Sequence, residues 1–321
     1  MRGERNKTVR HGDEMESGSR QAVRLCIGTV QFGMDYGVQG GARPSLGDAV
    51  AMLDYATQNG ADAIDTAAAY GTAEEVVGEF LSRKTLPRES VQVISKFGMA
   101  VFEGADVAAY PQRLKAAAET SLKRLRTGYL DAFICHVPSV AGDESVVSAM
   151  SALKESGLVR HIGFSIYETD EAMACMAAGT VDFMQAPFSV FDQRMRAAGV
   201  LAKAAAKGVD VHTRSAFVQG LMLMDAEAIP AHLAAAKPYV CELDELCREH
   251  GITRRALALA YVKAQPEISH LVFGVDNLCQ LKEIVADFRR GVPAEVVDGI
   301  AERFASVPAD IFMPNKWRKG K

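Results

Sequence analysis

Short apolar segments alternate along the chain with longer segments whose apolar residues recur about every 3.6 positions. The short segments have the length and β-branched character of strands, and the longer ones have the period of amphipathic helices. We predict eight strands, at residues 25–29, 63–65, 91–95, 132–135, 161–164, 183–185, 209–212 and 271–273. This alternation is typical of βα units arranged around a parallel sheet.

The segments between the strands are predicted to be helices, and one has clear ends. Ser45 is a suitable N-cap for a helix to Asn59, because its oxygen accepts a hydrogen bond from the first turn, and Gly60 suits the left-handed stop. Further helices are predicted at residues 73–83, 111–126, 145–156, 169–178, 194–207 and 278–290. Additional helical patterns at 231–250 and 253–264 precede the last strand.

The chain contains no repeat, low-complexity tract or Pro/Gly-rich linker that would divide it. A doubly wound sheet would need G-x-G-x-x-G after the first strand, whereas Gly28 and Gly33 have a different spacing. The 321 residues are compatible with one α/β barrel. We therefore predict a (β/α)8 TIM barrel as a single domain over residues 23–321, after a disordered polar tail at 1–22.

Composition and charge exclude several classes of protein. Lys and Arg number 36 and Asp and Glu 40, which gives a net charge of −4, and 49% of the residues are hydrophobic. These values disfavour a polybasic nucleic-acid binder and a disordered chain. Apolar runs fall short of the roughly 20 residues that a bilayer requires, and the N-terminus lacks the apolar region of a secretory signal. We expect a cytoplasmic protein that binds neither nucleic acid nor membrane.

The six cysteines do not have the spacing of a metal or redox motif. They lie at positions 26, 135, 175, 241, 247 and 279, and none forms a Cys-x-x-Cys pair. Because free cysteine is usually buried, we expect reduced thiols that lie mostly in the core. We expect no metal ligands among the polar residues at the ends of the strands.

Four polar residues lie where predicted strands end, which in a barrel of this kind is where active sites are built. Asp65 ends the second strand and Tyr70 follows in the next loop, while Lys96 and His136 end the third and fourth strands. An ammonium that stabilises phenolate lowers the pKa of a nearby tyrosine, and Lys96 is placed to act on Tyr70 in this way. Asp65 supplies the counter-charge that a buried lysine needs.

With His136 to orient a carbonyl oxygen, this set is suited to reduction of C=O by an external hydride. A Schiff-base aldolase acting through Lys96 is an alternative, although a carboxylate partner would keep the amine protonated. Each of the four residues alone would more often be structural than catalytic, but four at successive strand ends favour an active site.

Several motifs share the order and spacing of one known family. They are Asp65-Thr66-Ala67-x-x-Tyr70-Gly71 with Glu74 and Gly78, the strand-end Lys96, Leu125-x-x-x-Tyr129-Leu130-Asp131-x-x-x-x-His136, the stretch 157–165, and Gln185. Over roughly residues 25–290 the chain resembles the aldo-keto reductase superfamily. The resemblance implies a (β/α)8 barrel that binds NAD(P)(H) in an extended form without a Rossmann motif.

By matching position, the resemblance also assigns roles to individual residues. It implies that Tyr70 is the general acid/base, that Lys96 and Asp65 tune it, and that His136 orients the substrate. It implies cofactor contacts from Gly28, Thr29, Ser165, Gln185, Arg214, Ser215, Phe217, Gln219, Gly220, Gly274, Asp276, Asn277, Gln280 and Glu283. The chain departs from the family pattern at Ile166, where asparagine is usual, at Arg214, where an aromatic residue usually stacks on the nicotinamide, and at Ile284.

The expected activity is interconversion of a carbonyl compound (an aldehyde, ketone or sugar) and an alcohol. Gly274, Val275, Asp276 and Gln280 provide no basic group for the 2′-phosphate of NADPH, and Asp276 suits the ribose hydroxyls of NAD, so we expect a preference for NAD(H). A nucleotide-sensing regulatory subunit on the same fold is the other alternative. We expect a monomer or weak dimer that needs no metal.

Overall fold

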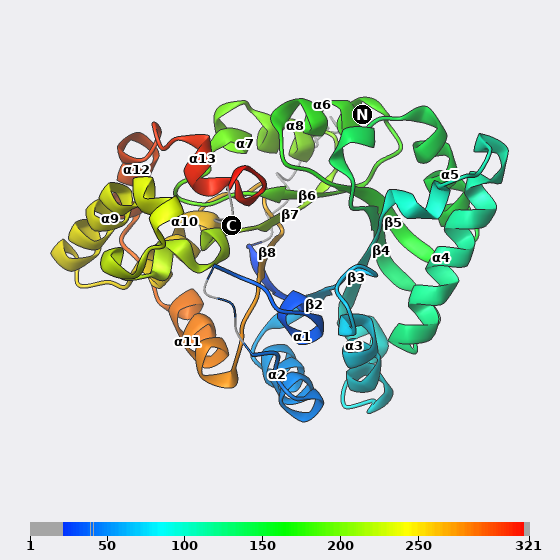
Figure 1. The fold of residues 1–321 in the computed structure, drawn as a ribbon, viewed down its shortest axis with the longest axis horizontal. Helices are drawn as coiled ribbons and strands as arrows, with labels where there is room; N and C mark the ends of the chain where they lie inside the picture. Colours follow the sequence, from blue (N-terminus) through cyan, green and yellow to red (C-terminus); the bar gives the residue numbers. More distant parts are fainter. Residues whose placement is uncertain (1–21, 39, 41, 318–321) are drawn as a thin grey trace, which may run out of the picture.

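The chain forms a closed barrel of eight parallel strands surrounded by helices (Figure 1). The structure is a computed structural model, and it describes residues 22–38, 40 and 42–317. The strands are β1 (Arg24–Gly28), β2 (Ala61–Asp65), β3 (Gln92–Phe97), β4 (Leu130–Cys135), β5 (Val159–Ser165), β6 (Phe183–Pro187), β7 (Asp210–Arg214) and β8 (His270–Phe273). The predicted (β/α)8 barrel and all eight predicted strands are confirmed.

Each strand pairs with its neighbours in the chain, and β1 closes the ring by pairing with β8. One irregularity lies between β1 and β2, where Leu25 pairs with Ala61 and Cys26 with Ala63, so that the register skips Asp62. The barrel interior holds a small apolar cluster that includes Cys26, Ile94 and Phe183. A much larger apolar core joins the strands to the surrounding helices.

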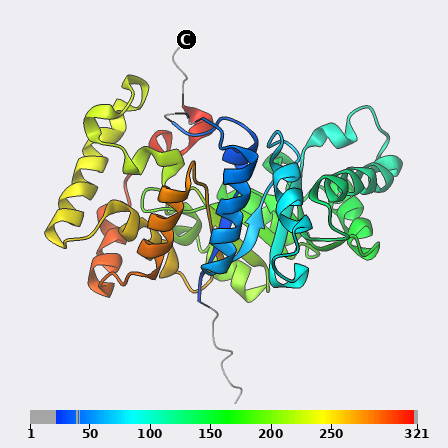
Figure 2. The ribbon, with the colours of Figure 1, turned by 90° about the horizontal axis from the view of Figure 1, so that it is seen from below.

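Thirteen α-helices accompany the strands in the described part of the chain. They are α1 (Val30–Gly33), α2 (Leu46–Gln58), α3 (Ala73–Ser82), α4 (Tyr110–Leu125), α5 (Glu144–Glu155), α6 (Thr169–Ala177), α7 (Arg194–Ala197), α8 (Val200–Ala206), α9 (Lys237–Glu249), α10 (Arg254–Lys263), α11 (Leu278–Arg289), α12 (Ala294–Arg303) and α13 (Ala309–Phe312). The Ser45 oxygen accepts a hydrogen bond from the Asp48 N–H, as the predicted N-cap of α2 requires. Figure 2 shows α2 and α3 along the outside of the barrel.

Two predicted helices differ from the structure. The helix predicted over 194–207 is two helices, α7 and α8, because Gly199 between them has a φ of +69° that a helix does not allow. The pattern at 231–250 begins as a 3-10 helix, Ala231–Ala236, and continues as α9, whose first turn contains Pro238. The short α1 and the helices α12 and α13 were not predicted.

The additional helices predicted before the last strand are confirmed as α9 and α10. Together with α12 and α13 they lie on one side of the barrel in Figure 1. The apolar face of α9 is buried, including Val240 and Leu243, and α10 contacts both α9 and α12. These helices therefore extend the core outward on the side of β7 and β8.

The predicted tail, residues 1–22, lies outside the described residues except for Ala22. Cys26, Cys135, Cys175 and Cys247 are buried free thiols, whereas Cys241 and Cys279 are exposed. The expectation that the thiols are mostly buried is therefore confirmed. Within the described residues, every helix is too short or too polar to span a bilayer.

Candidate active site

Four predicted catalytic residues meet at the carboxyl end of the barrel. Lys96 Nζ lies 2.7 and 2.6 Å from the two carboxylate oxygens of Asp65, and 3.4 Å from the phenol oxygen of Tyr70. The ammonium also donates to the Thr66 carbonyl at 3.0 Å. The His136 ring faces the Tyr70 ring edge-on, with 5.7 Å between the ring centroids. β2 and β3 are neighbouring strands, so their carboxyl ends bring Asp65 and Lys96 together.

The positive charge on Lys96 is stabilised by neighbouring polar groups rather than by water. Burial of the side chain opposes the charge, but Asp65 and the Tyr70 oxygen outweigh it, and the pKa of Lys96 is raised above its usual value. A Schiff base requires a neutral amine, and a lysine with a raised pKa is a poor nucleophile at neutral pH. The geometry therefore weighs against the aldolase alternative.

The Tyr70 phenol lies in an environment that keeps it protonated. Burial raises the pKa of Tyr70, and the positive charge of Lys96 lowers it only in part, so the result lies above the value of a free phenol. We expected Lys96 to make the phenol a stronger acid; its contribution has that sign, but desolvation is larger. The neutral phenol is the form that can donate a proton.

His136 follows β4 directly and is partly buried, and its backbone N–H donates to the Phe97 carbonyl at 2.8 Å. Burial and then the positive charge of Lys96 lower the pKa of His136 to about 4. The imidazole is therefore neutral at pH 7. A neutral ring beside Tyr70 can donate a hydrogen bond to a carbonyl oxygen without adding charge.

Two glycines fix the position of the Tyr70 loop against α1. A Cβ on Gly33 would lie 1.7 Å from the Tyr70 carbonyl oxygen, and a Cβ on Gly71 would lie 2.3 Å from the Gly33 carbonyl oxygen. Gly71 also has a φ of +57°, which favours glycine. The backbones of α1 and the loop after β2 therefore approach more closely than any side chain would permit, and this contact positions Tyr70.

A cavity of about 570 Å³ extends from Asp65 and Tyr70 to the start of α11. All the predicted cofactor residues line it except Ser165 and Asn277. The predicted residues that do so are Gly28, Thr29, Gln185, Arg214, Ser215, Phe217, Gln219, Gly220, Gly274, Asp276, Gln280 and Glu283. A single cleft of this volume is within the range of cofactor sites.

The two exceptions have other structural roles in or near the site. Ser165 is buried at the end of β5, where it pairs with Gln185 of β6. Asn277 is the N-cap of α11, and its side-chain oxygen accepts from the Gln280 N–H at 3.0 Å. Gln185 itself donates from Nε2 to Asp65 at 2.7 Å, so its amide nitrogen is engaged with the carboxylate that also pairs with Lys96.

The loop after β7 carries unusual backbone conformations beside the cavity. Ser215, Val218 and Gln219 have φ values of +68°, +50° and +54°, and Gly220 follows with +91°. Such conformations cost roughly 1–3 kcal/mol each for residues other than glycine, and they cluster where a backbone is shaped for a ligand. The Gln219 carbonyl also accepts from the Val38 N–H at 3.2 Å, which ties this loop to the loop after β1.

Arg214 ends β7, and its guanidinium lies over the Tyr167 ring, 4.3 Å from the centroid. It donates to the Ile166 carbonyl at 2.9 Å. The guanidinium at this position, where the family usually has an aromatic residue, therefore stacks on an aromatic side chain of the protein. Ile166, which replaces the usual asparagine, is fully buried.

The cavity is also lined by residues that were not among the predicted cofactor contacts, including Gln31, Tyr36 and Arg255. Gln31 lies on α1, and its buried Oε1 has no hydrogen-bond partner among the described residues. Gly274 leaves room for it, because a Cβ there would lie 2.3 Å from Gln31 Oε1. Arg255 comes from α10, and it contacts Glu283 and Asp287 at 2.8 Å each. No local motif marks Arg255, because packing of α10 against α11 brings it there.

These observations fit an extended dinucleotide. The cleft is long and mixed in polarity, its unpartnered Gln31 oxygen can accept from a ribose or amide group, and glycines at positions 28 and 274 open its wall. With the barrel, the buried Asp65 and Lys96 and the partly buried Tyr70, the site defines a nicotinamide-dependent oxidoreductase of the (β/α)8 class.

The family follows from the comparison with known proteins. The family model described as "Aldo/keto reductase family" matches residues 24–303, and the chain belongs to this family. It is therefore an NAD(P)(H)-dependent oxidoreductase. Its relatives include the L-galactose dehydrogenase of Arabidopsis thaliana, 29% identical over 74% of this chain and 77% of the relative. The NADH-specific methylglyoxal reductase of Escherichia coli is 28% identical over 71% and 78%.

Solved structures agree on the fold. The holo form of an aldo-keto reductase from Bacillus halodurans superposes with a TM-score of 0.69 at 22% identity, covering 92% of this chain and 95% of that one. A glycerol dehydrogenase from Gluconobacter oxydans has the same TM-score and identity, with 89% and 94% covered.

Proposed function

We propose that the protein reduces a small carbonyl compound with Tyr70 as the general acid, and catalyses the reverse oxidation with Tyr70 as the base. The observation that carries this proposal is the series of contacts from the buried Asp65 carboxylate through the buried Lys96 Nζ to the Tyr70 oxygen. These contacts leave the protonated phenol of Tyr70 facing the cavity, next to the fixed positive charge of Lys96. A positioned proton donor contributes about 10²- to 10⁴-fold to such a reaction.

NAD(P)H, held by the residues that line the cavity, would supply a hydride to the carbonyl carbon. As the C=O double bond opens, the Tyr70 O–H bond breaks and its proton passes to the carbonyl oxygen, which becomes the alcohol. The phenolate that remains is stabilised by Lys96 until it regains a proton from solvent. Neutral His136 orients the carbonyl oxygen toward Tyr70 by a hydrogen bond.

The proposed cofactor preference is for NAD(H). The Asp276 N–H donates to Gln280 Oε1 at 2.8 Å, and the Gln280 amide donates back to Asp276 at 3.4 Å, which keeps a carboxylate in the cavity wall. Arg255 is a cation in the same region, but Glu283 and Asp287 both pair with it. A 2′-phosphate would therefore meet little uncompensated positive charge. The E. coli relative described as NADH-specific supports the same preference.

The substrate proposed is a small polar aldehyde, ketone or sugar. Tyr36 and Arg214 line the cavity with Tyr70, and they provide hydrogen-bond donors beside apolar surface. Two relatives are named for their activity on L-galactose and on methylglyoxal. These compounds are suitable probes for a larger and a smaller carbonyl substrate. The protein is further proposed to act as a monomer or weak dimer in the cytoplasm.

A regulatory role without catalysis would favour a large apolar docking surface. The large apolar side chains exposed in the described residues are Met34, Tyr36, Leu46, Val107 and Leu278, on several different elements. This scatter gives no support to the regulatory alternative.

The test is a spectrophotometric screen of aldehydes and aldoses with NADH and NADPH, following oxidation of the reduced nicotinamide. We expect turnover of at least one small polar carbonyl, with NADH used at least as well as NADPH. Absence of turnover with every substrate, in protein shown to bind NADH by fluorescence, would contradict an enzymatic role.

A further inference from the structure

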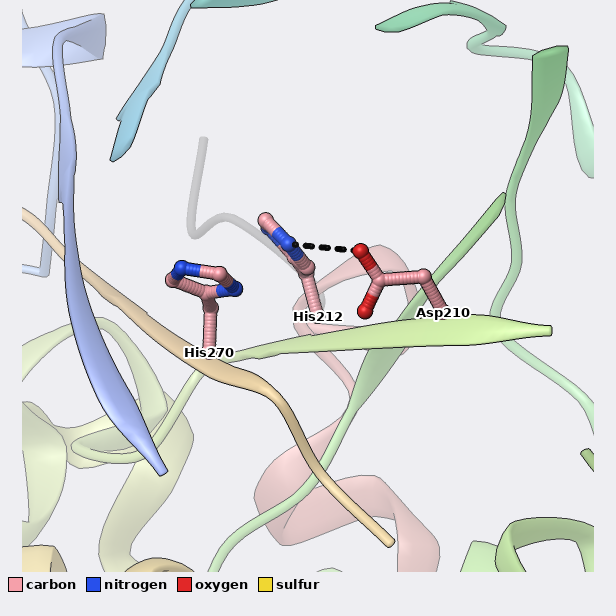
Figure 3. A group of neighbouring side chains, drawn as sticks. All are labelled: Asp210, His212 and His270. Atoms are coloured by element: carbon pink, nitrogen blue, oxygen red, sulfur yellow. Dashed lines mark ion pairs between the residues drawn. The ribbon is translucent and has the colours of Figure 1, made fainter. Parts of the chain in front are cut away.

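A second polar cluster lies inside the barrel at the end opposite to Tyr70. Asp210 and His212 lie two residues apart on β7 and therefore point to the same face, and His270 begins the neighbouring strand β8. His212 pairs with His270 in the strand register. Figure 3 shows the two imidazole rings next to each other, with Asp210 beside His212. One side-chain ligand atom from each of the three lies within 4.8 Å of those of the other two.

His212 is the residue that the protein leaves unsatisfied. Its side chain is completely buried, and neither ring nitrogen has a hydrogen-bond partner among the described residues. Asp210 Oδ2 lies 3.6 Å from Nε2, which is too long for a hydrogen bond. A buried polar atom without a partner costs about 1–3 kcal/mol, so a group that engages the His212 ring would recover this free energy.

The hydrogen bonds around His270 fix which of its nitrogens is free. Nε2 lies 3.0 Å from Asp62 Oδ1, and because a carboxylate only accepts, this nitrogen carries the proton. Asp62 is the residue skipped by the register between β1 and β2, and this bulge is where the strand pairing deviates. In neutral imidazole, Nδ1 then presents a lone pair, and it faces Ser269 Oγ at 3.1 Å.

The cluster contains more acceptors than protons. The single hydroxyl proton of Ser269 is shared among the Asp210 carboxylate, the Val211 carbonyl at 3.1 Å and His270 Nδ1. Arg24 pairs with Asp62, but the described residues provide Asp210 with no Lys or Arg partner. Several lone pairs therefore meet at this cluster, beside a carboxylate that no Lys or Arg of the described residues pairs with.

We propose that Asp210, His212 and His270 bind a divalent transition-metal ion of the Zn²⁺ type at the amino end of the barrel. Two imidazoles and a carboxylate are a common ligand set for Zn²⁺, with water as the fourth ligand. Tetrahedral Zn²⁺ separates its ligand atoms by about 3.3 Å, and the three ligand atoms here lie within 4.8 Å of one another, so the side chains must turn to close on the ion. The carboxylate–histidine contact of Asp62 with His270 is the kind of outer support that metal-bound histidines have.

The position of the cluster also allows an ion to enter. The side chains of Asp210 and Asp62 are 35% and 30% exposed, whereas both imidazoles are fully buried. The ion would approach past the carboxylates and join β7 to β8. Sequence spacing alone did not reveal this site, because His270 is far from the Asp-x-His pair along the chain.

The test uses the full chain with the exposed Cys241 and Cys279 replaced by serine, since surface thiolates also bind Zn²⁺. The protein is stripped with a chelator at slightly alkaline pH and dialysed against Zn²⁺, and bound zinc is counted by plasma mass spectrometry. We expect one equivalent of zinc and a Tm that rises with zinc concentration. Co²⁺ in place of zinc should give the visible absorption of a four-coordinate ion with nitrogen ligands.

The variants identify the ligands. His212→Asn should weaken zinc binding at least tenfold, and Asp62→Asn by about 10- to 100-fold through His270. His161→Asn is the matched control, because His161 Nδ1 also lies near a carboxylate, Asp182 at 3.3 Å, but is half exposed and has no third ligand. Should His212→Asn not fold, Asp210→Asn replaces it.

Two outcomes would overturn the proposal. One is that the parent chain binds no zinc or cobalt at this pH, which would mean that a proton on His212 satisfies the cluster. The other is that His212→Asn or Asp210→Asn binds zinc as tightly as the His161→Asn control, which would place the ion elsewhere.

Discussion

The two polar clusters at opposite ends of this barrel are built from similar residues but are satisfied in different ways. At the carboxyl end, Lys96 supplies a fixed cation whose protons are distributed to Asp65, Thr66 and Tyr70. At the amino end, His212 and Asp210 face each other without a hydrogen bond. A buried lysine supplies the positive charge and the N–H donors that a buried carboxylate needs. Histidines in the same place leave lone pairs that an external cation can bind. The first arrangement suits proton transfer and the second suits metal binding.

The largest effect is expected from removing the hydroxyl of Tyr70, the proposed proton donor of the carboxyl-end cluster. Tyr70→Phe should lower kcat for carbonyl reduction by about 10²- to 10⁴-fold and leave NADH affinity within a few-fold, because the proton is needed only in the transition state. Steady-state kinetics and fluorescence titration of NADH measure the two quantities.

Tyr129→Phe is the matched control for Tyr70→Phe. Tyr129 packs between Arg88 and Arg160, away from the cavity. Tyr129→Phe therefore removes a tyrosine hydroxyl without changing the site. Retention of more than a tenth of the parent turnover by Tyr70→Phe would remove Tyr70 from its assigned role.

The next effect concerns the position of Tyr70 rather than its chemistry. Gly33→Ala places a methyl group where the Tyr70 carbonyl now lies, 1.7 Å away, so the loop must move. Displacement of a catalytic group by about 1 Å can cost 10²-fold in rate, and overpacking costs about 1–3 kcal/mol of stability. Gly47→Ala in α2 is the control, because its Cβ meets only Ser45 Oγ at 3.8 Å. Equal turnover in the two variants would show that this contact does not position Tyr70.

A smaller effect is expected at the far end of the cavity. Asp276→Arg replaces a carboxylate with a cation, and one charge-assisted hydrogen bond of about 1.5 kcal/mol corresponds to roughly tenfold in preference for NADPH. The ratio of kcat/KM for the two cofactors measures the change. If the parent chain favours NADPH tenfold and the variant leaves the ratio unchanged, the account of cofactor choice is wrong, and Arg255 is the next residue to replace.

The smallest effect separates the two clusters by their dependence on metal. Stripping the protein with a chelator should leave the rate of carbonyl reduction unchanged, because Tyr70 and Lys96 supply the electrophilic assistance. The same treatment should lower Tm by roughly 2 °C, through loss of an ion that links β7 to β8. Activity that disappears with chelator and returns with Zn²⁺ would show that the ion takes part in the reaction.

The sequence predicts much of the carboxyl end and little of the amino end, for a physical reason. Residues at the carboxyl ends of parallel strands converge in any such barrel, so the positions of Asp65, Lys96 and His136 follow from strand boundaries alone. The left-handed backbone at Val218 does not follow from residue type, because a β-branched residue disfavours it.

Features that depend on register and packing were also missed. The bulge at Asp62 arises from the pairing of β1 with β2, and Arg255 reaches the cavity because α10 packs on α11. The break between α7 and α8 could have been predicted from the sequence. A glycine within a helical pattern can end a helix, as Gly199 does here.

The most direct test of the central claim is the pH dependence of single-turnover carbonyl reduction in the parent chain, Lys96→Arg and Lys96→Met. Reduction requires protonated Tyr70, so the rate falls as pH rises through the pKa of the phenol. Burial raises this pKa and Lys96 lowers it in part, so removing the charge raises it further. We predict that Lys96→Met is slower and that its alkaline limb moves to higher pH, while Lys96→Arg keeps the limb near that of the parent chain. A folded, active Lys96→Met variant whose alkaline limb does not move would contradict the account.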